Sequence, residues 1–267
     1  MRTLAQLAEK PQIALFDIET TPNLGWTWGK YEQDVIEFEQ QSYMLCFSVK
    51  WLNSPKIETY SLPDFSTWQK EVKDKSRIWY KHDDKELVMK LWQVMGEADV
   101  IVAHNGNDFD LKYTRGRMLV HELNPPPESK TVDTLKLARR HFKFPSNKLD
   151  DIGRDLDVGR KLPHTGFHLW LGCMRGDPDC WKLMQRYNKQ DVALLERVYL
   201  KIRPWATNHP NINIFKEEPP PTACPKCGSS HIRRAGKAYT NTQIYKRYQC
   251  LECRGWFRGE NMKKDGL

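Results

Sequence analysis

Residues 15–20 read Leu-Phe-Asp-Ile-Glu-Thr. Their first two residues end a run, residues 12–16, that is apolar almost throughout. The run predicts a buried β-strand, and alternate side chains of a strand point to the same side. Asp17 and Glu19 would therefore lie together, with Ile18 facing the other way. Two like charges beside an apolar strand are costly unless they are neutralised, commonly by a divalent cation. This stretch alone is equally compatible with a metal site and with a solvated strand end.

The composition indicates a globular protein without a membrane segment. The chain has 267 residues, of which 39% are hydrophobic, and its N-terminus lacks the apolar core of a signal peptide. We therefore expect a cytoplasmic or nucleoid-associated protein that is not secreted and has no membrane partner. Residues 203–267 contain 12 Lys+Arg and 5 Asp+Glu, and so hold nearly all of the net charge of +8. A basic segment of this kind favours a polyanion such as nucleic acid, although a solvated basic surface is the simpler alternative.

The order of predicted elements indicates an α/β fold. Three strands near the N-terminus are followed by alternating helices and strands, which predicts a mixed sheet. The further strands are expected at residues 44–51, 56–62 and 99–103, and the helices at 83–98, 109–122, 133–142, 148–156 and 177–202.

Two further segments carry acids that could join Asp17 and Glu19. Residues 104–110 read His-Asn-Gly-Asn-Asp-Phe-Asp, where a strand is expected to meet a helix, and Asp110 would project from the first turn of that helix. In the last helix, Tyr187 and Asp191 are four residues apart and would share one face. Alone, each of these residues is also typical of an ordinary helix surface or core.

Together, the three segments resemble the DEDD 3′→5′ exonucleases, in the subgroup with Tyr in the third motif. The resemblance covers about residues 12–200 and is greatest to the proofreading domains of family B DNA polymerases and their stand-alone relatives. It implies an RNase H-like fold, a mixed five-stranded sheet flanked by helices. Asn105 and Phe109 match positions that hold substrate in that family.

The resemblance also implies a two-metal mechanism with Mg²⁺ or Mn²⁺. Asp17 would bridge both ions, Glu19 and Asp191 would complete the ion that holds the attacking water, and Asp110 would serve the other. Two such ions stabilise both ends of a phosphodiester displacement. Tyr187 would orient the attacking water, a role that suits a phenol with an ordinary pKa near 10.

The C-terminal segment contains two CxxC pairs separated by 22 residues, which predict one structural, tetrahedral Zn²⁺. The predicted ligands are Cys224, Cys227, Cys250 and Cys253. Residues 223–258 resemble the zinc ribbons of transposases and transcription factors. Basic and aromatic residues are interleaved between and after the pairs, which favours nucleic-acid binding. The candidate contacts are Arg233, Arg234, Lys237, Lys246, Arg247 and Trp256. A ribbon that docks replication or repair proteins is the alternative.

We therefore expect an exonuclease domain at residues 1–203, a linker at 204–222 and a zinc ribbon at 223–267. The predicted function is a stand-alone 3′→5′ exonuclease that releases nucleoside monophosphates from the 3′ ends of single-stranded DNA. The alternatives are an RNA-directed exonuclease of the same family and a non-catalytic adaptor that binds nucleic acid.

Overall fold

A computed structural model describes residues 11–31, 33–52, 54–74, 77–218, 220 and 222–262. The ends of the predicted domains, residues 1–10 and 263–267, and Pro219 and Pro221 of the predicted linker lie outside the described residues. Of the helices that the structure describes, none has the length and hydropathy to cross a bilayer.

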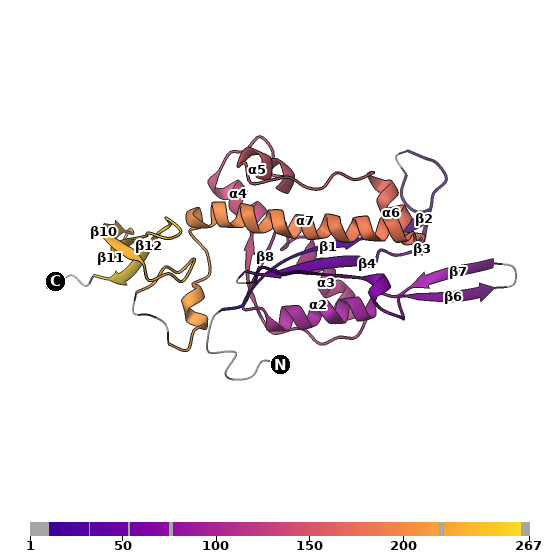
Figure 1. The fold of residues 1–267 in the computed structure, drawn as a ribbon, viewed down its shortest axis with the longest axis horizontal. Helices are drawn as coiled ribbons and strands as arrows, with labels where there is room; N and C mark the ends of the chain where they lie inside the picture. Colours follow the sequence, from indigo (N-terminus) through magenta and orange to yellow (C-terminus); the bar gives the residue numbers. More distant parts are fainter. Residues whose placement is uncertain are drawn as a thin grey trace.

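The centre of the fold is a mixed five-stranded sheet in the order β5-β4-β1-β8-β9 (Figure 1). β1 pairs antiparallel with β4 and parallel with β8, so it joins the antiparallel half to the parallel half. The strands are β1 (Ile13–Thr20), β4 (Met44–Trp51), β5 (Ile57–Ser61), β8 (Val100–Ala103) and β9 (Lys130–Asp133).

Helices cover both faces of this sheet, and its buried side chains form two clusters. Ala14, Phe16 and Ile18 of β1 pack with α2 (Lys85–Glu97) and α3 (Asp110–Val120). Ile13 and Leu15 pack on the opposite face, with the other helices. These are α4 (Thr134–His141), α5 (Leu149–Asp155) and the C-terminal half of α7 (Pro178–Ile202). By alternation, Asp17 and Glu19 share the face of Ile13 and Leu15, over which α7 runs.

The predicted fold class is confirmed, but several elements differ from the expected ones. The fifth strand, β9, lies just before α4, where the sequence predicted no strand. Helix α6 (Phe167–Met174) and two hairpins were not expected. The hairpins pair β2 (Leu24–Trp26) with β3 (Glu37–Gln40), and β6 (Gln69–Asp74) with β7 (Arg77–His82).

A small three-stranded sheet follows α7 and lies beyond its C-terminal end in Figure 1. Its strands are β10 (Ile232–Tyr239), β11 (Ile244–Cys250) and β12 (Trp256–Asn261). The segment between α7 and this sheet is packed rather than free. His209 contacts the Tyr199 hydroxyl at 2.8 Å, and the Ile212 N–H donates to the Pro225 carbonyl at 2.9 Å.

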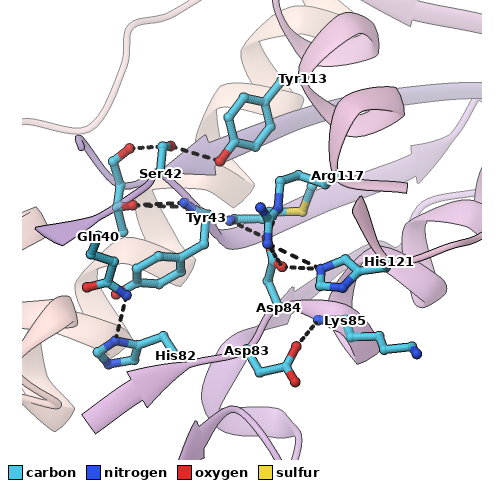
Figure 2. A network of polar contacts seen from close by, with 12 residues as sticks. Gln40, Ser42, Tyr43, His82, Asp83, Asp84, Lys85, Tyr113, Arg117 and His121 are labelled. Atoms are coloured by element: carbon cyan, nitrogen blue, oxygen red, sulfur yellow. Dashed lines mark hydrogen bonds and ion pairs between the residues drawn. The ribbon is translucent and has the colours of Figure 1, made fainter. Parts of the chain in front are cut away.

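An ion-pair cluster centred on Asp84 fastens α2, α3 and β4 together (Figure 2). The Asp84 side chain is fully buried and accepts two hydrogen bonds from the Arg117 guanidinium, at 2.5 and 2.9 Å. It also accepts the Met44 N–H at 2.8 Å and lies 2.6 Å from His121. Burial opposes the charge, but the hydrogen bonds from Arg117 and Met44 outweigh burial and hold the pKa of Asp84 below its ordinary value. The guanidinium engages both carboxylate oxygens, so we assign the cluster to the fold rather than to metal binding.

We expect Asp84→Ala to lower the free energy of unfolding at pH 7 by about 3–5 kcal/mol, because it leaves Arg117 buried without its partner. Urea denaturation measures the loss. Because the folded-state pKa of Asp84 is lowered, its contribution is present at neutral pH and disappears as the pH falls through that pKa. The double variant with Arg117→Met should lose less than the sum of the two single variants, and additive losses would contradict the pairing.

Candidate active site

Three carboxylates meet where β1 passes under α7. Asp17 and Glu19 come from β1, and Asp191 comes from the middle of α7. One ligand oxygen from each of the three lies within 4.8 Å of the others. Asp191 is fully buried, whereas Asp17 and Glu19 are half-buried. The structure thus brings together three of the four acids that the sequence singled out.

The fourth acid, Asp110, is held against β1 from the start of α3. Its Oδ1 accepts the N–H of Ile18 at 3.1 Å, and its side chain is buried. Its charge is also felt at Asp17, where it is the largest electrostatic contribution to a raised pKa. Asp110 therefore lies beside the group of three without being one of its members.

The loop that leads into α3 is fixed by Asp133, at the end of β9. Asp133 accepts the N–H groups of Asn105 at 3.1 Å and of Asn107 at 3.2 Å, and also caps α4. Asn105 has a positive φ of 65°. Gly106 is needed because a Cβ there would lie 2.4 Å from the Ala103 Cβ. This loop leaves the Phe109 ring 43% exposed at the entrance to α3.

Helix α7 supplies two further residues to the site. Asn188, which the sequence analysis did not single out, donates its Nδ2 to Asp17 Oδ2 at 2.9 Å. Tyr187 lies one turn before Asp191, as the spacing predicted, and its hydroxyl accepts a hydrogen bond from Lys161 at 3.2 Å.

Lys161 is the main site residue that sequence reasoning missed. It lies in the loop after α5, where its N–H donates to Asp150 at 2.7 Å. Its ammonium group donates to Asp191 Oδ2 at 2.5 Å. Burial disfavours this cation, but the charges of Asp191, Tyr187 and Asp17 raise the pKa of Lys161. No periodic pattern marks residues 156–166, so only the folded chain shows that this lysine reaches the acids.

The four acids are difficult to ionise together. Burial raises the pKa of Asp17 well above its ordinary value, and the neighbouring acids raise it further. Burial, followed by the charge of Asp191, raises the pKa of Glu19 to about 8. Burial likewise raises the pKa of Asp110 to about 7, and that of Asp191 also lies above its ordinary value, although Lys161 opposes this increase. Clustered acids of this kind need positive charge to stay ionised together.

The donor set fits a hard divalent cation. Carboxylate oxygens are the ligands that Mg²⁺ and Mn²⁺ prefer. Lys161 engages only Oδ2 of Asp191, and the buried Oδ1 has no hydrogen-bond partner within the described residues. A buried acceptor without a partner is rare and costly. A cation at this position would satisfy it.

A cleft of about 670 Å³ opens from Asp17. Three cationic residues, Arg139, Lys148 and Lys161, line this cleft together with the acids Asp17 and Asp150. His104 supports the wall by contacting Thr134 at 2.9 Å and the Asn147 carbonyl at 3.0 Å. Burial lowers the pKa of His104 to about 4, so it acts as a neutral strut.

The four cysteines of the C-terminal module converge. The sulfur atoms of Cys224 and Cys253 are 3.7 Å apart, and those of Cys227 and Cys250 are 3.6 Å apart. A tetrahedral Zn²⁺ with bonds of about 2.3 Å places its sulfurs about 3.8 Å apart. The cluster therefore fits a structural zinc ion.

The other predicted nucleic-acid contacts lie on the small sheet. Arg233, Arg234 and Lys237 are on β10, Lys246 and Arg247 on β11, and Trp256 begins β12. By the strand register, Arg233, Arg247 and Trp256 face one side of the sheet, and Arg234, Lys237 and Lys246 face the other.

Comparisons with known proteins agree with the fold. No curated protein matches the chain significantly. The family B DNA polymerase from the hyperthermophilic archaeon Pyrobaculum calidifontis is a similar solved structure, with a TM-score of 0.50 and 16% sequence identity. The similarity covers 73% of this chain but 26% of the polymerase, and at this identity it shows the fold alone.

The family comparison is more specific. The model of the RNase H superfamily matches residues 57–203, which include Asp110, Tyr187 and Asp191. The matched region is more than half of the chain, and the mixed five-stranded sheet agrees with the match. The chain belongs to the RNase H superfamily.

Proposed function

We propose that this protein is a metal-dependent 3′→5′ exonuclease that acts on unpaired DNA ends and releases nucleoside monophosphates. The observation that carries the proposal is the convergence of Asp17, Glu19 and Asp191, with Asp110 beside them. A nuclease fold supports phosphodiester hydrolysis, and the resemblance to the DEDD exonucleases supports the direction of digestion. A non-catalytic adaptor would have no need for acids whose ionisation is so unfavourable.

In this proposal, the acids hold two Mg²⁺ or Mn²⁺ ions. Asp17, Glu19 and Asp191 would hold one ion, and Asp17 and Asp110 the other. When bound, such ions supply a nucleophilic hydroxide and neutralise charge on the attacking and leaving oxygens.

The protein's own groups position the reactants. Lys161 orients both the Tyr187 hydroxyl and Asp191, and Asn188 orients Asp17. The Tyr187 hydroxyl is thus placed to orient a water molecule by hydrogen bonding. Burial first, and then the charge of Asp191, raise its pKa, which favours this role over that of a general base.

The substrate is proposed to enter along the basic wall of the cleft. Arg139 and Lys148 can donate hydrogen bonds to phosphate groups there. The exposed Phe109 ring offers a surface on which an unpaired base can stack.

We also propose the division into a nuclease domain at residues 1–203, a connecting segment at 204–222 and a zinc ribbon at 223–267. The converged cysteines and the separate three-stranded sheet support it. About 45 residues cannot build a large core, so zinc would supply much of the folding free energy of the ribbon. The ribbon is proposed to help the enzyme bind its substrate.

We expect Asp17→Asn and Asp191→Asn each to lower the rate of hydrolysis by roughly 10³-fold or more, the order of loss found when one preorganised electrostatic group is removed. Digestion of 3′-labelled and 5′-labelled DNA and RNA with Mg²⁺ measures the rate, the direction and the preferred sugar. Tyr187→Phe is the control, because it keeps every proposed ligand and should retain measurable activity. Full activity of either Asn variant would refute the assignment, and faster digestion of RNA would replace DNA as the substrate.

We expect the thermal stability of the protein, dialysed free of Mg²⁺ and Mn²⁺ but with zinc retained, to fall between pH 6 and pH 8. The pKa values of Glu19, about 8, and Asp110, about 7, are raised by folding, so the folded state binds more protons than the unfolded state in this window. Each kcal/mol lost lowers Tm by roughly 2–4 °C in a chain of this size.

Added Mn²⁺ should therefore raise Tm more at pH 8 than at pH 6, because fewer protons compete with the ion. Without added ions, Asp17→Asn should be more stable than the parent at pH 8, because one of the clustered charges is gone. A stability that rises between pH 6 and pH 8 in the parent, and equally in Asp17→Asn, would contradict the coupled acids.

A further inference from the structure

The register of the small sheet sorts its basic residues onto two faces. Arg233 pairs with Gln249, which pairs in turn with Trp256, and Arg247 pairs with Arg258. Paired residues, and alternate residues along a strand, share a face. One side, called the arginine face here, therefore consists of Arg233, Tyr245, Arg247, Gln249, Trp256 and Arg258.

The arginine face is open and carries guanidinium groups laid on aromatic rings. Arg247 lies 5.2 Å from the centre of the Trp256 ring, and Arg258 lies 5.1 Å from the centre of the Tyr245 ring. Arg233 donates two hydrogen bonds to the Gln249 side chain, at 2.7 and 3.0 Å. The three arginines are exposed, and Trp256 is 45% exposed.

The opposite face carries packed aromatic rings and three further cations, Arg234, Lys237 and Lys246, of which Arg234 and Lys237 are exposed. Tyr248 stacks on Phe257 with 5.6 Å between ring centres, and a Cβ on Gly259 would lie 2.5 Å from the Tyr248 ring. Phe257 also borders a cavity, which is lined by Ile214 and Pro225 on one side and by Arg258 beside it. Lys246, which points to this side, forms an ion pair with Glu260 at 2.7 Å.

The charges on the arginine face repel one another. Arg247 and Arg258 stand directly opposite each other, an arrangement of like charges that destabilises a sheet. Within the described residues, none of the three guanidiniums forms an ion pair with a carboxylate. In this small module the repulsion between the arginines has no carboxylate to offset it, which indicates a ligand that brings negative charge.

The chemistry of the face indicates the kind of ligand. Planar guanidiniums bind phosphates through paired hydrogen bonds, and exposed Trp and Tyr rings stack on nucleobases. An acidic peptide could neutralise the arginines, but it has no planar groups to match the rings. Both features together fit a single-stranded nucleic acid, whose bases are free to stack.

We propose that the arginine face is the surface on which the ribbon binds single-stranded nucleic acid. The inference deepens the proposed function, because the strand that it holds would be the substrate of the acidic site. From Asp191 to the end of α7 at Ile202 is about 17 Å at 1.5 Å per residue, which is the first part of the distance that a strand would span to reach both sites.

The chain offers a matched pair of variants, because two pairs of neighbours in the sequence point to opposite faces. Arg233→Ala with Arg247→Ala removes two charges from the arginine face. Arg234→Ala with Lys246→Ala removes two charges from the other face, at adjacent positions. The exposed ion pair lost with Lys246 is of little consequence for stability. Both variants are made in full-length Asp17→Asn protein, so that binding is measured without hydrolysis.

Binding of a labelled single-stranded DNA of about 20 nucleotides, longer than typical single-strand sites, is titrated at several salt concentrations. We expect the arginine-face variant to bind at least tenfold more weakly and to reduce the slope of log K against log salt by about 1.4, or 0.7 for each charge. The variant of the opposite face should change affinity less than threefold. Zinc content and Tm confirm that both variants remain folded.

Trp256→Ala should weaken binding without changing the salt slope, and Trp256→Phe should restore part of the affinity. Equal effects of the two double variants, or competition by polyglutamate as strong as that by unlabelled DNA, would overturn the inference. Hydrolysis by the parent protein separates the two proposals. If the parent hydrolyses DNA and the double variants behave alike, only this inference fails. If the variants differ and the parent does not hydrolyse nucleic acid, only the proposed function fails.

Discussion

The alternation of side chains along β1 is the constraint on which the rest of the structure depends. Ile13 and Leu15 must face the core beneath α7, so Asp17 and Glu19 have to follow them onto the same side. Helix α7 then brings Asp191 over the strand, and α3 brings Asp110 to the Ile18 N–H. Because these elements are rigid, the four acids cannot move apart to relieve their repulsion. The protein keeps them together at a cost that bound cations would offset.

Lys161 shows how the chain meets part of that cost itself. Its ammonium group pairs with one oxygen of Asp191 and leaves the other oxygen buried without a partner. A second lysine on that oxygen would satisfy the carboxylate completely and remove it as a ligand. The single lysine instead lowers the repulsion while it preserves a place for a divalent ion. Asp150 holds the backbone of Lys161, so the balance depends on a loop that is itself anchored to α5.

Local patterns were sufficient to predict the strand that carries Asp17 and Glu19, the fold class and the cysteine cluster. They could not identify β9, because four residues that lead directly into α4 have no periodicity of their own. Lys161 was missed because its ammonium group contacts residues that are 26 and 30 positions away. The faces of the ribbon were hidden for another reason. The pairing of β10 with β11 shifts between Arg234 and Lys237, and the residues of β12 that pair with Tyr245 and Arg247 are three positions apart, so counting alternate residues fails along β10 and β12.

The attachment of the ribbon to α7 affects how the two proposed binding surfaces would act together. The Lys226 ammonium donates to the Pro204 carbonyl just beyond the helix, and the Tyr199 hydroxyl contacts His209. The spacing between the two surfaces is therefore set by a helix rather than by a flexible tether. Under the two proposals, a strand held at one surface would meet the other at a high effective concentration, and this advantage would depend on the span of the strand matching the distance between the surfaces. Strands too short to span this distance would gain no avidity from the ribbon.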